Sequence, residues 1–205
     1  MQKKKDTVNF YLSFFILLFL GYCLWCVVLY LNVFVSAAKI TELGPDELLR
    51  VKIYGSSHTQ TEKTVSATFA IIDSAGNEIA AIERSWAGSY LSVDFNILTV
   101  CGKQFVFPER IEGRSNILMN GRFPAKKSTK LDRYYNENGQ CLLLGFGSTL
   151  RNRERLYAIS KMANNRLPII NLWLKKTVTV DLSNCVDGKY YSITKSGSGI
   201  KIQEL

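Results

Sequence analysis

The first part of the chain contains 32 consecutive residues, Thr7–Ala38, without any Asp, Glu, Lys, Arg or His. Within this run, the 26 residues of Phe10–Val35 are apolar except for Ser13 and Asn32, and as a helix they reach about 39 Å. The hydrocarbon core of a bilayer requires only about 20 such residues. A helix in a soluble core carries polar residues on one face at a period of about 3.6, and this run has no such face. The run therefore predicts one membrane-spanning helix, residues 9–37.

The ends of this run suit a signal peptide as well as an uncleaved anchor. Met1–Lys5 is a basic leader, and the small residues within Val35–Ala38 satisfy a signal-peptidase rule. The apolar part of a signal peptide is about 7–15 residues long, however, and the run here is much longer. We therefore predict an uncleaved signal-anchor helix, with cleavage as the alternative.

Flanking charges predict the orientation of this helix. Lys3–Lys5 precede the run, whereas the charges that follow it are nearly balanced, and cytoplasmic flanks carry the excess of Lys and Arg. Pro45, followed by two acidic residues, predicts a short helical turn just outside the membrane. The predicted organisation is a short cytoplasmic tail (1–8), a transmembrane signal-anchor helix (9–37), a juxtamembrane segment (38–50) and a periplasmic or extracellular β-rich domain (51–205).

The predicted membrane helix offers little chemistry of its own. It contains no ionisable acid, base or cation, which argues against proton relay or ion conduction by this segment. It also lacks the Gly-xxx-Gly pair that favours tight helix dimers. Its predicted partner is the lipid bilayer, and its oligomeric state is left open.

The rest of the chain alternates apolar and polar residues at the period of two that is typical of β-strands. Val65, Ala67, Phe69 and Ile71, for example, share one face. The predicted strands are Thr64–Asp73, Glu78–Arg84, Tyr90–Phe95, Ile97–Cys101, Gln104–Phe107, Leu142–Phe146, Thr177–Leu182, Tyr190–Thr194 and Ile200–Glu204. The fold class is therefore mainly β, sandwich-like or a partly open barrel, with one short amphipathic helix, preceded by a single N-terminal transmembrane helix.

The single helix of this domain is predicted from its cap and its apolar stripe. Ser148 or Thr149 can cap the first turn, and apolar residues recur at helical spacing over Leu156–Ala163. Residues 124–140 predict an exposed loop, because they are rich in polar and turn-forming residues.

Residue types that support catalysis or metal binding are scarce. Cys101, Cys141 and Cys185 are spaced unlike any zinc motif, and a disulfide between two of them is left open. His58 is the only histidine and lies in a polar, loop-like stretch, which disfavours a catalytic triad. Gly145–Ser148 is interpreted as a turn and helix cap rather than a phosphate cradle, because the third glycine of that motif is missing. We predict no catalytic residue, no metal site and no cofactor, and we favour a protein that is not an enzyme.

Charge is distributed unevenly along the domain. Residues 39–100 carry 5 cations and 8 anions, whereas residues 101–205 carry 18 cations and 8 anions. A surface of this kind attracts anionic lipid headgroups, acidic glycans or an acidic partner protein; a solvated surface without a ligand is the alternative, and nucleic acid is not expected. The candidate anionic-ligand surface consists of Arg122, Lys126, Lys127, Lys130, Arg151, Arg153 and Arg155.

These features predict a single-pass, membrane-anchored protein whose extracytoplasmic β-rich domain binds or scaffolds an anionic partner. Two alternatives stay open. A cell-envelope enzyme acting on an anionic substrate requires a pocket with several titratable groups of displaced pKa. An accessory subunit of a larger membrane complex requires an apolar contact patch.

Overall fold

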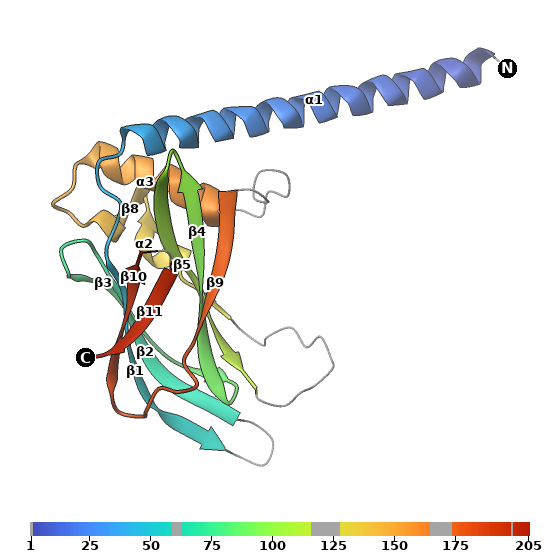
Figure 1. Ribbon diagram of the computed structural model, residues 1–205. Helices are drawn as coiled ribbons and strands as arrows, with labels where there is room; N and C mark the ends of the chain where they lie inside the picture. Colours follow the sequence, from blue (N-terminus) through green and yellow to red (C-terminus); the bar gives the residue numbers. More distant parts are fainter. Residues whose placement is uncertain (1, 59–62, 116–127, 165–173, 198) are drawn as a thin grey trace.

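The computed structural model consists of one long N-terminal helix followed by a mainly β domain (Figure 1). It describes residues 2–58, 63–115, 128–164, 174–197 and 199–205. The prediction of a mainly β domain preceded by an apolar helix is confirmed at this level.

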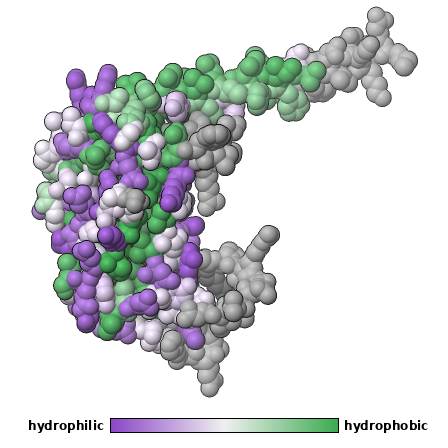
Figure 2. All heavy atoms as spheres, in the orientation of Figure 1, coloured by the Kyte–Doolittle hydropathy of each residue, from purple (hydrophilic) through white to green (hydrophobic). Residues whose placement is uncertain are grey.

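Helix α1 comprises Gln2–Lys39 and is 38 residues long. Its C-terminal part lies across one end of the domain, and the rest projects beyond it (Figure 1). Leu12–Lys39 is long and apolar enough to cross a membrane, and hydrophobic residues cover the described part of the projecting helix (Figure 2). The helix extends past the predicted residues 9–37 at both ends, because nothing in its flanks breaks helical geometry.

Two antiparallel sheets form most of the domain, and we call them sheets A and B. Sheet A has the order β11–β10–β1–β2–β3, with strands Gly199–Glu204, Tyr190–Ser196, Glu47–His58, Lys63–Ile72 and Glu78–Ala87. Sheet B has the order β6–β5–β4–β9, with strands Thr129–Lys130, Lys103–Arg114, Tyr90–Val100 and Lys175–Asp181. A short hairpin pairs β7 (Asn136–Glu137) with β8 (Gln140–Cys141).

Sheets A and B share one hydrophobic core, which follows from the alternation along their strands. On β2, Val65, Ala67 and Phe69 are at most 4% exposed. Phe69 packs edge-to-face on Trp86 of β3, with 5.5 Å between the ring centroids. The Trp86 indole N–H donates to Thr129 Oγ1 of β6 at 3.0 Å, which links the edge of sheet A to the edge of sheet B.

The predicted helix is present as α3 (Leu150–Asn164) and lies beside the C-terminal part of α1 (Figure 1). Thr149 caps it, because the Asn152 N–H donates to the Thr149 carbonyl at 3.0 Å and to its hydroxyl at 3.3 Å. Leu156 and the other residues of the apolar stripe are buried. Two shorter elements precede it: α2 (Asp132–Tyr135) and the 3₁₀ turn η1 (Leu142–Leu144).

Three of the predicted strands differ from the structure: one is absent, and the other two are parts of a single strand. Leu142–Phe146 is not a strand, because Gly145 adopts a positive φ of 71° and its N–H closes the 3₁₀ turn on the Leu142 carbonyl. Tyr90–Phe95 and Ile97–Cys101 are not separate strands but form the single strand β4, which pairs with β5 along its whole length.

The helical turn predicted at Pro45 is also wrong, because Glu47 begins β1 and pairs with Thr194 of β10. Burial by itself would raise the pKa of the Glu47 carboxyl. The hydrogen bonds from Arg50 and Ser192 outweigh this effect and lower its pKa. The acidic residue that suggested a helix start therefore serves as a cross-strand acceptor.

The exposed loop predicted at 124–140 is wrong for most of the residues that the structure describes there, although Asn138 and Gly139 do form an exposed turn. Residues 124–127 lie outside the described part of the chain, whereas residues 129–130 form β6, 132–135 form α2 and 136–137 form β7. Leu131 and Tyr135 are fully buried, and the Tyr135 hydroxyl donates to the Pro108 carbonyl at 2.9 Å. An aromatic residue with a satisfied hydroxyl thus anchors a segment whose composition resembles a loop.

The cysteines are free thiols in different surroundings. Cys101 is exposed in the turn between β4 and β5. Burial raises the pKa of the Cys141 thiol to about 12, and burial together with the nearby Asp181 carboxylate raises that of Cys185 to about 11. The disulfide that the sequence left open is not formed among these residues.

We predict that a charged maleimide at neutral pH modifies Cys101 in the folded full-length protein and leaves Cys141 unmodified. The thiolate is the reactive form, and Cys141 is both inaccessible and protonated. Peptide mass spectrometry measures the labelling, Cys101→Ser identifies the signal, and denaturant serves as the positive control for Cys141. Labelling of Cys141 without denaturant would contradict the described core.

Candidate functional site at the helix–domain junction

The C-terminal end of α1 is held by a lysine from sheet B. Lys103 Nζ donates to the carbonyls of Ala37 at 3.0 Å, Ala38 at 3.4 Å and Ile40 at 2.7 Å. Lys103 begins β5 directly after the tight turn of Cys101 and Gly102, both of which have positive φ. The hairpin tip therefore places a cation at the end of a helix whose last carbonyls have no partner within the helix.

Helix α3 supplies the second part of this junction. Arg155 Nη1 donates to the Lys39 carbonyl at 3.0 Å. Asn152 Nδ2 lies 3.1 Å from both Thr41 Oγ1 and Glu42 Oε1, just after the helix end. Two cations thus oppose the negative end of the α1 dipole, and the hydrogen bonds fix the direction in which α1 leaves the domain.

The predicted basic surface is divided among different places. Arg122, Lys126 and Lys127 lie outside the described residues. Lys130 is exposed on β6, at the edge of sheet B, whereas Arg151, Arg153 and Arg155 lie on α3. The described contacts do not join Lys130 to the three arginines.

The three arginines of α3 have different surroundings. Arg151 is exposed. Arg153 is half-buried and lies over the ring of Phe146, 5.5 Å from its centroid. Arg155 is committed to the Lys39 carbonyl, so it serves the junction. Of the three arginines predicted to bind an anionic ligand, only Arg151 is exposed and has no contact described above.

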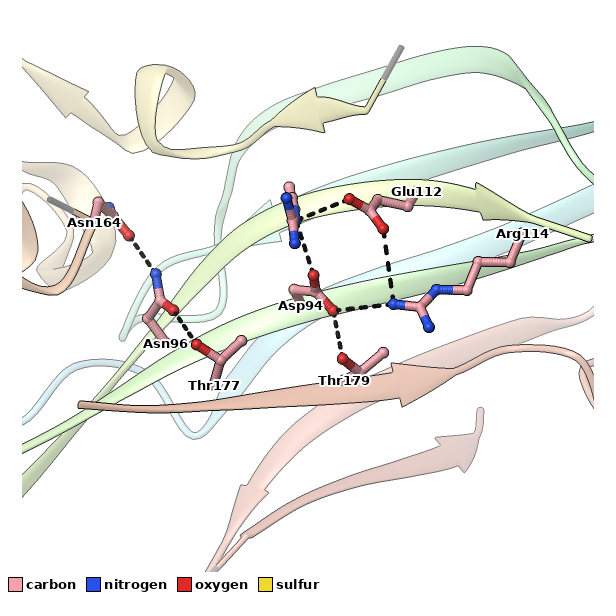
Figure 3. Close-up of polar contacts among 8 residues, drawn as sticks. Asp94, Asn96, Glu112, Arg114, Asn164, Thr177 and Thr179 are labelled. Atoms are coloured by element: carbon pink, nitrogen blue, oxygen red, sulfur yellow. Dashed lines mark hydrogen bonds and ion pairs between the residues drawn. The ribbon is translucent and has the colours of Figure 1, made fainter. Parts of the chain in front are cut away.

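A second cluster of charged side chains lies on the face of sheet B that points away from the shared core (Figure 3). The Asp94 carboxylate, 3% exposed, accepts hydrogen bonds from Arg110 Nε at 2.8 Å and Thr179 Oγ1 at 2.6 Å. Glu112 lies 3.0 Å from Arg110 Nε and 3.7 Å from Arg114 Nη2. Arg114 Nη2 also lies 3.8 Å from Asp94. We call these five residues the sheet B network.

The charges of the sheet B network balance one another. Burial of Arg110 opposes its charge, but the hydrogen bond to Asp94 and the charges of Glu112 and Asp94 outweigh this effect and raise its pKa. Two carboxylates and two guanidinium groups are therefore mutually satisfied. This arrangement pairs every charged member of the network with opposite charges on neighbouring strands, which stabilises the sheet.

Neighbouring amides continue this polar face toward α3 (Figure 3). Asn96 Nδ2 donates to Asn164 Oδ1 at 3.0 Å, and Thr177 Oγ1 donates to Asn96 Oδ1 at 3.1 Å. The last residue of α3 is thus joined to the middle of sheet B. The alternation of Ser92, Asp94 and Asn96 with apolar residues on β4 is the sequence signal for this face, but the same alternation is typical of a solvated sheet face and does not indicate that the three residues are buried.

Comparisons with known proteins and a search for metal ligands give no further assignment. The chain matches no family model, no curated protein and no solved structure. Within the described ranges, no three His, Cys, Asp or Glu side chains gather as a metal site requires.

We predict that Lys103→Met loosens the junction without unfolding the domain. Three carbonyls of the α1 end lose a charged donor, which weakens this region by about 1–3 kcal/mol. Amide hydrogen exchange of residues 37–42 in detergent micelles measures the change as faster exchange. Lys189→Met, which removes an exposed ion pair with Glu204, is the matched control. Equal exchange in both variants would contradict the role of Lys103.

We also predict that Asp94→Asn destabilises the domain by about 1–3 kcal/mol, because it leaves two arginines to share one carboxylate. Urea unfolding of the full-length protein in micelles, followed by circular dichroism, measures the loss. The exposed Asp187→Asn is the control. If the network acts as a unit, Asp94→Asn combined with Arg110→Met costs less than the sum of the two single changes.

Proposed function

We propose that this protein is a single-pass signal-anchor membrane protein with its N-terminus in the cytoplasm and a sandwich-like β domain on the extracytoplasmic side. The domain binds or scaffolds an anionic ligand at the outer membrane surface and does not act as an enzyme. The junction between α1 and the domain is the observation that carries this proposal.

The junction supports a scaffolding role because it fixes orientation. Lys103 of sheet B and Arg155 of α3 hold consecutive carbonyls at the end of α1. Ser36 and Ala37 in the last turns of α1 are buried as well. A domain on a flexible tether samples many directions, whereas this one presents one face in one direction relative to its anchor.

The start of α3 supports an anionic ligand. Arg151 is exposed there, and Arg153 lies over the ring of Phe146, which is itself 82% exposed. The N-terminal end of a helix carries a positive partial charge that adds to these cations. A cation beside an exposed ring suits a ligand that combines negative charge with apolar surface, as lipids do.

The sheet B network supports binding over catalysis. It brings together four charged side chains, but each carboxylate is paired with both arginines. Catalytic acids and bases need a group whose proton affinity is set for transfer to a substrate. A network that satisfies its own charges is instead typical of a structural role.

We predict that the full-length protein sediments with membranes and that, in nanodiscs of neutral lipid, it binds anionic vesicles at low salt. Arg151→Glu combined with Lys130→Glu weakens this binding, because it reverses two exposed cations of the predicted surface. Flotation with vesicles of 7:3 neutral to anionic lipid measures retention, and an immobilised sulfated glycan tested in parallel separates a lipid ligand from a glycan ligand.

Lys201→Glu is the matched control, because it reverses an exposed charge on β11, away from α3. Arg155 is left unchanged in these variants, since its loss would disturb the junction. Absence of retention on both probes at low salt would remove the anionic ligand from this proposal. Recovery of the protein in the soluble fraction would remove the membrane anchor.

A further inference from the structure

The second half of α1 has two opposite faces of different character. Cys26, Val33, Ser36 and Ala37 are buried, and they recur at the spacing of one helix face. This inward face contacts the domain, where α3 is the main neighbour of α1. Three of these four residues are small, which allows α1 to approach the domain closely.

The opposite face of the same segment is bulky and exposed. Leu24, Val27, Val28, Leu31 and Val35 are between 47% and 66% exposed and follow the spacing of a single stripe. We call these five residues the outward stripe. Hydrophobic residues along this part of α1 form a continuous surface beyond the domain (Figure 2). Nothing in the described part of the chain covers this surface.

The length of α1 determines where the outward stripe lies. Thr7–Trp25 contains 19 residues and reaches about 28 Å, which already matches a hydrocarbon core of about 30 Å. Cys26–Lys39 adds 14 residues, or about 21 Å, whereas the headgroup layer on one side is only about 5–8 Å thick. An upright helix would therefore place Leu31 and Val35, the two residues of the outward stripe nearest the domain, in water.

We propose that the outward stripe is seated in lipid, at the boundary between acyl chains and headgroups of the outer leaflet. Helix α1 is then steeply inclined, and the domain lies against the membrane instead of standing away from it. This inference rests on the proposed function, because it requires that α1 is a membrane anchor. Beyond the proposed function, this inference names the face of α1 that contacts lipid and the resulting orientation of the domain relative to the membrane.

Lipid is the occupant that the residue types favour. Helices that pack on other helices within a membrane use small residues to approach closely, and here the small residues face the domain. The outward stripe continues the apolar run of the membrane segment without a charged residue. Trp25, Asn32 and Lys39 are exposed at intervals of seven residues and so form one flank of the stripe, as suits a helix lying at the headgroup level.

Because the junction is rigid, the inclination of α1 also sets the orientation of the domain relative to the membrane. Lys103 and Arg155 bind carbonyls in the last turn of α1, so the helix cannot change its inclination without moving sheet B and α3 with it. The domain face next to α1 is therefore held near the headgroups. A ligand that binds this face of the domain therefore binds at the membrane surface.

Depth-dependent quenching of tryptophan fluorescence tests this pose. The full-length protein is placed in nanodiscs that hold one copy each, made with lipids brominated near the carbonyl end of the acyl chains. Trp25→Phe provides the background, to which Leu31→Trp or Val35→Trp is added. Both sites are exposed in the structure, so neither change disturbs the core. Tyr54→Trp in the same background is the control, because Tyr54 is exposed on sheet A, away from α1.

We expect Leu31→Trp and Val35→Trp to lose as large a fraction of their emission as Trp25 does in the unmodified protein, and Tyr54→Trp to lose none. Quenching of Trp25 without quenching at positions 31 and 35 would overturn the inclined pose and leave the membrane anchor intact. Absence of quenching at Trp25 itself would overturn the proposed function. If quenching at 31 and 35 disappears when each disc holds two copies, a second copy and not lipid covers the outward stripe.

Discussion

The end of helix α1 sets the arrangement of the rest of the molecule. A helix leaves its last carbonyls without internal partners and concentrates negative partial charge there. In this protein Lys103 and Arg155, which lie 66 and 116 residues from their acceptors Ala37 and Lys39, satisfy those carbonyls. The hairpin of sheet B and helix α3 must therefore meet at one point. A membrane-length helix and a β domain become one body by this contact.

Helix α3 connects the end of α1 to the middle of sheet B. Its first turns bind the end of α1 through Asn152 and Arg155, and its last residue, Asn164, binds Asn96 in the middle of sheet B. The sheet B network lies on the same face, and its member Asp94 is two residues from Asn96 on β4. Several of the cations that make residues 101–205 basic are therefore used to bind carbonyls and carboxylates. Net charge alone overestimates how much positive surface is free for a ligand.

Local patterns were predictable from the sequence, and long-range contacts were not. The alternation of β2 and the cap and stripe of α3 gave correct elements, because each depends on residues close in sequence. Lys103 directly follows Gly102 in a turn sequence, and no residue near it in the sequence indicates that its acceptors lie on another element. The burial of Asp94 was not predictable either, because it depends on arginines and a threonine from neighbouring strands. The basic surface for an anionic ligand stays a prediction, since Arg122, Lys126 and Lys127 are outside the described residues.

The cost of exposed apolar surface explains why the orientation of α1 matters. Full burial of a Val or Leu side chain is worth about 1.5–3 kcal/mol, so a half-exposed one left in water forgoes about 1 kcal/mol. Leu31 and Val35, which an upright helix would leave in water, together would forgo about 2 kcal/mol. Tilting a helix costs only a fraction of a kcal/mol per Å of mismatch. The junction holds the domain on the opposite face of α1, so tilting can cover the stripe with lipid without breaking a single contact within the domain.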